Sequence, residues 1–307
     1  MLWLSSNSLG VRIDPRHGGE VLDLIDQRSG RQLLGRPPFA SEPPLAGELD
    51  ETTWTRSYRG GWQLLLPNAG NPCVVDEVAH GFHGCACTER WEVASVDAAR
   101  AELEWAGHGL HVRRRFAVDG DTLRVRSIVT AARDCAFLWV EHIGLGIELL
   151  DPAVEIALPG GTAYELSERT GPVEPPAGAP SWPEVLLLDG TLERANRAVL
   201  TTPRSRLFVV ANLPEGRLKV CNRDRGQGME ITWDTRWLPH LWVWHETRTT
   251  GGPWRELTEL LVVEPASVPH TLGLARAREH GQAHALAAGE CAETEIAVRA
   301  LSGERVQ

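Results

Sequence analysis

The sequence has no apolar run that approaches the ~20 residues needed to span a bilayer as a helix. Its first residues, MLWLSSNSLGVRID, lack the basic start and the apolar segment of a signal peptide. Basic residues are outnumbered by acidic ones, 31 to 41, and the formal net charge of −10 gives no support to binding of nucleic acid or of an anionic membrane. We therefore expect a soluble cytoplasmic protein with no nucleic-acid or membrane partner.

Cysteine and lysine are also scarce. The six cysteines are scattered through 307 residues, which indicates free thiols in a reducing compartment rather than a disulfide framework. Lys219 is the only lysine, a bias that we attribute first to codon usage. The 42% hydrophobic and 23% charged content is ordinary for a globular protein and argues against disorder.

Alternation of apolar and polar residues with a period of two dominates the sequence. Between residues 110 and 118, one parity is apolar except for Arg114, and the other is rich in arginine. Asp119-Gly120-Asp121 then interrupts the pattern, and a second alternating run follows as far as Ile128. This arrangement predicts a β-hairpin with one buried face.

Similar short runs recur along the chain, separated by many of its 30 glycines and 20 prolines. Residues 271–289 form the best helix candidate, and Gly281 limits it to a short helix. The Pro-rich segment 170–184 is too short to mark a domain boundary. The pattern predicts an all-β fold, a large antiparallel sandwich or barrel, with residues 1–307 as a single domain.

The segment HGFHGCACTERW, residues 80–91, places two histidines and two cysteines within eight positions: His80, His83, Cys85 and Cys87. Zinc accepts these ligands, but structural zinc sites usually draw on two separated ligand pairs, and the sequence contains no CxxC pair. On a strand, His80 would also point away from the other three. We interpret the segment as two small buried cysteines and two unrelated histidines, with no metal.

Tryptophan is unusually frequent, with twelve residues against five phenylalanines and two tyrosines. Its densest group lies between residues 231 and 254 and comprises Trp233, Trp237, Trp242, Trp244 and Trp254. Indole faces can stack on sugar rings, but aromatic side chains also fill β cores, and for the cluster alone the core is the preferred interpretation. Trp242 and Trp244 share a strand parity, so one face of that strand is expected to be aromatic.

Two titratable groups follow apolar runs. Glu264 ends the run ELLVVE, and Glu141-His142 follows FLWV. Desolvation disfavours the ionised form of a carboxylate at the mouth of a buried strand, so such a group can act as a general base. For each residue alone, a structural role is the preferred interpretation.

Taken in order, four segments resemble the aldose 1-epimerase (galactose mutarotase-like) family. HGGEVLDLIDQRSGRQLL (17–34) is similar to its opening hairpin, and GGWQLLLPNAG (60–70) with FHGCACTERWEV (82–93) resembles a signature of one branch. LWVEHIGLG (138–146) and LPHLWVWHE with GGPW and ELLVVEP (238–265) are similar to its later strands. The resemblance spans most of the chain.

The resemblance implies a large antiparallel β-sandwich and catalysis without a metal or organic cofactor. By position, it makes Glu264 the catalytic base and His142 the catalytic acid, and it places His83 and Asn68 along the sugar site. The expected activity is interconversion of the α and β anomers of a hexose or related aldose by acid–base ring opening and closure.

Three more residues in or near the matched segments are candidate sugar contacts. Trp62 and Trp244 offer indole faces, and Arg59 offers a guanidinium that would suit a phosphosugar, although a surface arginine is the preferred interpretation. The sequence departs from the family pattern at Cys85, where a glutamate is usual, and at Ile143, where a proline is usual. These departures keep open a non-catalytic carbohydrate-binding protein on the same fold. A zinc protein built on residues 80–87 ranks third, and the oligomeric state stays open.

Overall fold

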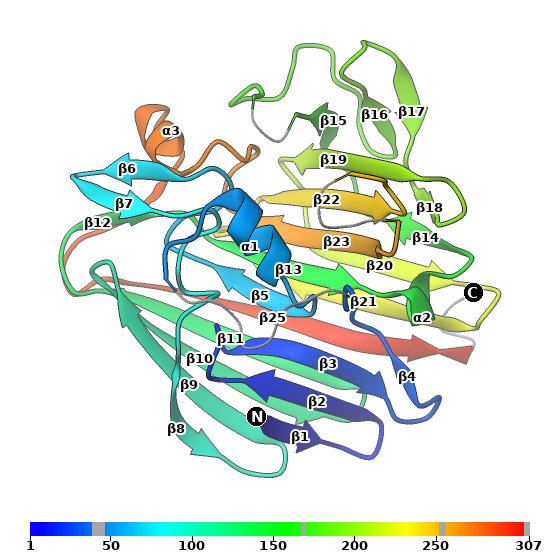
Figure 1. The fold of residues 1–307 in the computed structure, drawn as a ribbon, viewed down its shortest axis with the longest axis horizontal. Coiled ribbons are helices and arrows are strands. Elements are labelled where there is room, and N and C mark those ends of the chain that lie inside the picture. The colour runs from blue at the N-terminus through cyan, green and yellow to red at the C-terminus, as the bar shows by residue number, and fades with distance from the viewer. Residues whose placement is uncertain (39–46, 168–169, 252–255, 304–307) are drawn as a thin grey trace.

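The computed structural model describes residues 1–38, 47–167, 170–251 and 256–303 (Figure 1). Two large β-sheets pack face to face, and every strand pairing within them is antiparallel except the one between β15 and β16. The predicted all-β class is confirmed, and the sheets form a sandwich rather than a barrel. Trp254 of the tryptophan-rich segment lies outside the described residues.

The larger sheet carries the candidate site. Its order is β1-β2-β3-β5-β13-β23-β22-β19-β15-β16-β17, with β4 paired to β3. In that order its strands are β1 Leu2–Ser5, β2 Leu9–Asp14, β3 Glu20–Asp26 with β4 Arg31–Gln32, β5 Trp62–Leu65, β13 Val140–Leu145, β23 Glu259–Ala266, β22 His240–Thr247, β19 Arg204–Ala211, β15 Thr162–Leu166, β16 Glu184–Leu186 and β17 Leu192–Arg194.

The smaller sheet lies behind the first in Figure 1 and has the order β18-β14-β20-β21-β25-β11-β10-β9-β8. Its strands are β18 Arg197–Val199, β14 Ala153–Ala157, β20 Gly216–Asn222, β21 Gln227–Trp233, β25 Cys291–Ser302, β11 Thr122–Ala131, β10 Leu110–Asp119, β9 Arg100–Gly107 and β8 Glu92–Val96.

Two small strand pairs and three short helices complete the part of the chain that the structure describes. The pairs are β6 Cys73–Val75 with β7 Val78–His80, and β12 Cys135–Phe137 with β24 His284–Leu286. The helices are α1 Glu51–Ser57, α2 Ile147–Leu150 and α3 Leu274–Glu279. α3 lies within the predicted segment 271–289 and ends before Gly281, as expected. Among the described residues, no helix is long and apolar enough to cross a membrane.

The predicted hairpin is present as β10 and β11. Its register pairs Asp119 with Thr122, so Gly120 and Asp121 form a two-residue turn, and Gly120 has the positive φ of 56° that such turns require. Along β10, buried residues alternate with less buried ones, as the period-two pattern predicts.

The main core lies between the two sheets and contains apolar side chains from both. One charged pair is buried within it: Arg114 of β10 donates a hydrogen bond to the Glu141 carboxylate of β13 at 2.8 Å. The indole N–H groups of Trp62 and Trp139 donate to the same carboxylate at 2.6 and 3.2 Å. This network explains why an arginine occupies the buried parity of β10.

A second apolar cluster lies on the opposite face of the larger sheet, away from the smaller sheet. It includes Leu65 of β5, Val140 of β13 and Val262 of β23, and α1 contributes Trp54 to it. Figure 1 shows α1 in front of β5 and β13. We call this surface of the larger sheet the outer face. The candidate site lies on it.

Candidate functional site

His142 and Glu264 lie opposite each other on neighbouring strands. The register of β13 and β23 pairs Val140 with Ala266 and Ile143 with Val263, which sets His142 against Glu264. Directly opposed residues of an antiparallel pair share a face and have Cβ atoms about 4.5–5.5 Å apart. The two residues that the resemblance implied as acid and base are therefore adjacent on the outer face.

Residues in register on the two flanking strands extend this pair into a row across the sheet. Gln63 of β5 is registered against His142, and Trp242 of β22 is registered against Glu264. The indole N–H of Trp242 donates to the Val268 carbonyl at 2.8 Å, so this ring is fixed next to the carboxyl. The two catalytic candidates thus occupy the centre of a four-strand row on a rigid sheet.

Helix α1 covers the pair. The Asp50 carboxylate accepts hydrogen bonds from the backbone N–H and the hydroxyl of Thr53, which caps the first turn. Trp54 then stacks on Tyr58 with ring centroids 5.2 Å apart, and the two rings meet His142 edge-on at 5.7 and 5.1 Å. The helix therefore forms an aromatic wall against the imidazole.

The sequence reasoning missed this helix. An Asp followed by Glu51 and, one turn later, Arg56 is a usable capping and charge signal, but the helix has only seven residues and little periodicity. Tyr58 was missed with it. Its hydroxyl lies where a Cβ on Gly144 would come within 2.6 Å, so a glycine at position 144 makes room for it.

Four polar atoms at this site are buried and have no hydrogen-bond partner among the described residues. They are Gln63 Oε1, His142 Nδ1, Glu264 Oε2 and the Tyr58 hydroxyl. Folded proteins pair the great majority of their buried polar groups, because each unpaired group costs about 1–3 kcal/mol. Four such atoms at one site are what a binding place for a polar ligand would offer.

His83 stands beside the pair. Its ring centroid is 5.8 Å from that of His142 and 4.5 Å from that of Trp54. The backbone N–H of Gly70 donates to His83 Nδ1 at 3.0 Å, so the neutral ring carries its proton on Nε2 and can donate there. His83 has a φ of 65° in a turn, so the strand assumed for residues 83–87 is wrong.

Burial determines the protonation of all three titratable groups. It raises the pKa of Glu264 well above its usual value and lowers the pKa of His142 to about 3. Burial, followed by the proximity of His142, also lowers the pKa of His83 well below 6.5. Burial thus favours the uncharged form of each group, a protonated Glu264 beside two neutral imidazoles. The pair then holds one proton that it can share.

Of the other predicted contacts, only Trp244 lies on the outer face of the strands next to the pair. It is half-buried on β22, registered against Val262, and packs against the outer-face cluster. Trp242 and Trp244 therefore give β22 one aromatic face, as their parity predicts.

Trp62 lies on the inner face of the sheet, contrary to its expected sugar contact. Its indole donates to Glu141 and packs in the core between the sheets. Its parity on β5 is opposite to that of Gln63, which faces His142. Because strand neighbours point to opposite faces, a residue adjacent to the site in sequence lies away from it in space.

Asn68 and Arg59 are engaged by the protein itself. The Asn68 amide donates to the carbonyls of Asn71 and Gly81 and accepts from the Leu274 N–H, so it ties three loop segments together. The Arg59 guanidinium pairs with the buried carboxylates of Asp14 and Glu20. The structure therefore gives both residues a structural role in place of the predicted sugar contact.

The four metal-ligand candidates of residues 80–87 do not converge. Cys87 lies under α1, where the Trp54 indole approaches its sulfur at 3.5 Å, whereas Cys85 lies near Glu48 and His108. A different set, Glu48, Cys85 and His108, could hold a metal ion.

A cavity of about 320 Å³ lies away from the pair, at the ends of β15 and β19. Its lining includes Glu165, Ser167, Ser205 and Arg206. His142 and Glu264 are only 2% and 3% exposed, so a ligand reaches them only if neighbouring side chains move.

Solved structures share this fold across nearly the full length of the chain. A protein from Synechocystis sp. PCC 6803 is 17% identical, with a TM-score of 0.70 over 98% of this chain and 96% of the other. A candidate aldose 1-epimerase from Escherichia coli K12 is 18% identical, with a TM-score of 0.69 over 98% of both chains. A galactose mutarotase-like protein from Lactobacillus casei is 14% identical, with a TM-score of 0.63 over 98% of this chain and 99% of the other.

No protein-family model matches the sequence, and none of the curated proteins matches it. At 14–18% identity, the likeness to these structures establishes architecture and not activity. The resemblance seen in the sequence is confirmed at this level: the chain has the galactose mutarotase-like fold.

Proposed function

We propose that the chain is an aldose 1-epimerase-like isomerase that interconverts the anomers of a hexose or related aldose. The observation that carries the proposal is the pair His142 and Glu264, adjacent on the outer face, each with a buried polar atom that lacks a protein partner. A sugar offers hydroxyl groups and a ring oxygen that match such atoms. The likeness to mutarotase-like structures supports the same conclusion.

In the proposed reaction, Glu264 removes the proton of the anomeric hydroxyl while His142 donates a proton to the ring oxygen. The bond between the anomeric carbon and the ring oxygen breaks, and the aldehyde forms. After rotation about the adjacent carbon–carbon bond, the reverse transfers close the ring as the other anomer. Both protons return to their donors, so no cofactor is consumed. Each positioned acid or base contributes about 10²–10⁴-fold.

Glu264 must be ionised to act as the base. Burial favours its protonated form, but hydrogen bonds from sugar hydroxyls to the carboxylate favour the ionised one. The proposed reaction starts from the state in which the sugar stabilises an ionised Glu264 and His142 carries the proton. Tyr58 and His83 can each donate a hydrogen bond to the sugar from the walls of the site, and Trp244 offers an aromatic surface beside it.

The test is anomer exchange followed by NMR. Pure α-glucose or α-galactose, and then phosphosugars, are dissolved with and without protein, and the growth of the β signal is measured. We expect acceleration in the wild type and a loss of at least about 100-fold in Glu264→Gln, which keeps the shape of the side chain and removes the base. Glu246→Gln is the matched control, because Glu246 is also a buried carboxyl with a raised pKa but is hydrogen-bonded to Thr249. Equilibration at the buffer rate with every sugar would refute the isomerase.

The second candidate is a non-catalytic carbohydrate-binding protein. The burial that favours protonated Glu264 supports it, because a protonated carboxyl cannot remove a proton. Titration calorimetry with the same sugars separates the two functions, since binding without accelerated exchange would identify a binding protein.

A further inference from the structure

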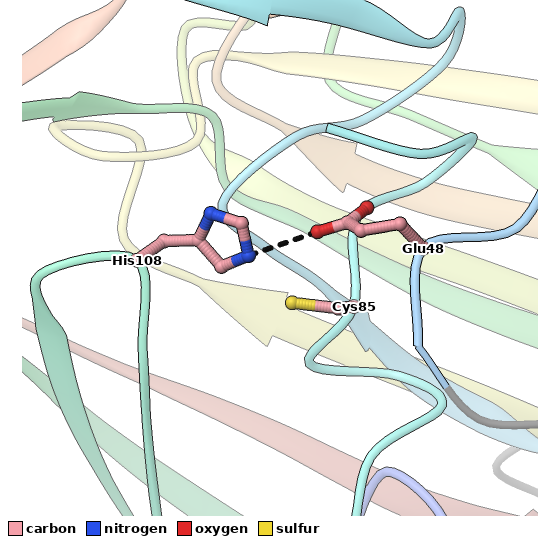
Figure 2. Close-up of side chains that lie close together, drawn as sticks. All are labelled: Glu48, Cys85 and His108. Atoms are coloured by element: carbon pink, nitrogen blue, oxygen red, sulfur yellow. Dashed lines mark ion pairs between the residues drawn. The ribbon is translucent and has the colours of Figure 1, made fainter. Parts of the chain in front are cut away.

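Glu48, Cys85 and His108 come together from three separate segments of the chain. Glu48 precedes α1, Cys85 follows β7, and His108 lies in the turn between β9 and β10. Their ligand atoms lie within 4.8 Å of one another. Figure 2 shows the imidazole and the carboxylate facing each other, with the Cys85 sulfur beside them; the His108 Nε2 to Glu48 Oε1 distance is 2.9 Å.

The chemistry of this set selects a borderline transition metal. A thiolate, an imidazole and a carboxylate are the three side-chain ligands that zinc uses, whereas calcium and magnesium prefer oxygen alone. Zinc bonds of about 2.0–2.3 Å in tetrahedral geometry place neighbouring ligand atoms roughly 3.3–3.8 Å apart. The three ligand atoms lie within 4.8 Å of one another, so only small side-chain shifts would bring them to that spacing.

A second imidazole adjoins the cluster. The rings of His80 and His108 have centroids 4.9 Å apart, and His80 is only 6% exposed. Among the described residues, neither His80 Nδ1 nor His108 Nδ1 has a hydrogen-bond partner. The Cys85 thiol hydrogen-bonds to the Glu48 carboxylate, and Glu48 also pairs with His108, but these contacts account for neither of the two ring nitrogens.

We propose that Glu48, Cys85 and His108 bind one zinc ion, with His80 or a water molecule in the fourth position. The ion would join the segment that leads into α1 to the loop that carries His83, because Glu48 lies two residues before Asp50 and Cys85 two residues after His83. It would therefore hold two walls of the outer-face site in place. The ligands are distinct from His142 and Glu264, so the zinc site does not depend on the proposed isomerase activity.

The test uses the full chain, stripped with a chelator and titrated with cobalt(II) and then with zinc. We expect one cobalt ion per chain, the absorption bands of a tetrahedral site, a thiolate-to-cobalt charge-transfer band, and displacement by zinc. Cys85→Ser should abolish the charge-transfer band. His108→Gln and Glu48→Gln should weaken zinc binding by at least about 100-fold, because loss of even a partner of a ligand costs 10–100-fold.

Two variants serve as matched controls. Cys291→Ser removes an exposed thiol, and His111→Gln removes an imidazole that lies 3.5 Å from the Glu104 carboxylate but belongs to no group of three metal-ligating side chains among the described residues. Both should bind zinc as the wild type does. Circular dichroism checks the fold of each variant. Should Cys85→Ser, at a buried position, fail to fold, the variants of the two partly exposed ligands, His108→Gln and Glu48→Gln, test the proposal. Absence of tight stoichiometric binding, a charge-transfer band that persists in Cys85→Ser, or affinity unchanged in both His108→Gln and Glu48→Gln would overturn the proposal. Glu264→Gln should leave zinc binding intact, which separates failure here from failure of the isomerase.

Discussion

The outer face of the larger sheet holds three side chains in an energetically unfavourable environment: His142, Glu264 and Tyr58. Each leaves one polar atom buried without a partner among the described residues, which costs about 1–3 kcal/mol per atom. The sheet compensates through the apolar cluster that surrounds them. A ligand can supply the missing partners, and the proposed sugar would do so through its hydroxyl groups.

The first residue-scale prediction concerns pH and stability. Because burial raises the pKa of Glu264 above 4.5, the unfolded chain ionises this group before the folded chain does, and stability falls as pH rises above 4.5. We expect Glu264→Gln to have a higher free energy of unfolding than the wild type at about pH 8, and the difference to vanish near pH 4. Urea unfolding at the two pH values measures both quantities.

For His142→Gln we expect the opposite dependence of stability on pH. Burial lowers the pKa of His142 to about 3, so the unfolded state takes up the proton first as pH falls below 6.5. The wild type should therefore lose stability relative to His142→Gln as pH falls from 6.5 towards 3. The free energies of unfolding of Glu264→Gln and the wild type should likewise differ by an amount that depends on pH. A difference that stays constant with pH would show that the Glu264 carboxyl is not desolvated as the structure describes.

The second residue-scale prediction concerns Tyr58 and Gly144. Gly144→Ala would bring a methyl group within 2.6 Å of the Tyr58 hydroxyl and should destabilise the fold. Tyr58→Phe removes a buried hydroxyl and should cost little stability, but it should slow anomer exchange roughly 2–10-fold if the hydroxyl binds the sugar. In a double-mutant cycle, we expect a favourable coupling of about 1 kcal/mol, since Gly144→Ala meets no hydroxyl in the Phe background. Additive effects would contradict the contact.

Among the elements, α1 contributes most to the site. Its seven residues are too few for a stable isolated helix, so capping and packing must hold it. Asp50 caps it, and Trp54 and Tyr58 attach it to the outer face. Access to His142 therefore depends on how firmly this helix is held.

The element-scale prediction concerns the cap. Asp50→Ala removes both hydrogen bonds to Thr53 and should increase hydrogen exchange of the α1 amides and raise the apparent KM for the sugar. Asp50→Asn keeps an accepting oxygen and should stay close to the wild type. Asp97→Ala is the remote control, because Asp97 caps a turn between β8 and β9 through the N–H groups of Ala99 and Arg100. Equal exchange rates of the α1 amides in Asp50→Ala and the wild type would contradict this role.

At the scale of the whole molecule, a buried ion pair contributes to the packing between the two sheets. Arg114 and Glu141 are each about 1% exposed and lie between the sheets, and the guanidinium also lies over the Trp62 ring at 5.6 Å. Glu141 immediately precedes His142 on β13, so this ion pair lies on the inner face of the sheet, behind His142. The inner network thereby fixes the strand that carries His142, the proposed acid, on the outer face.

The molecule-scale prediction concerns this ion pair. Glu141→Gln leaves the Arg114 charge buried without its counterion and should destabilise the fold by about 3–5 kcal/mol. The double variant Arg114→Met with Glu141→Leu should recover most of that loss, because apolar packing replaces the pair. Glu104→Gln breaks the partly exposed pair with Arg113 and should cost less than about 1 kcal/mol. Urea unfolding compares the variants; an equal loss in Glu141→Gln and Glu104→Gln would contradict the prediction.

The alternation of the sequence was sufficient to predict the class and the β10–β11 hairpin. A period of two is a local property, and a turn such as Asp119-Gly120-Asp121 specifies its own pairing. The same locality explains the wrong assignments. Trp62 belongs to the matched motif 60–70, but its parity on β5 places it in the core. A single domain over residues 1–307 stays a prediction.

The sequence by itself determined the alternation of the strands and their buried faces, because these depend on short-range pattern, and its family resemblance implied the candidate pair His142 and Glu264. Only the tertiary structure decided which residues meet. Cross-strand register set His142 against Glu264, a short capped helix brought Tyr58 to them, and three distant loops brought Glu48 and His108 to Cys85. These contacts join residues far apart in the chain, and no local pattern encodes the distance between such residues.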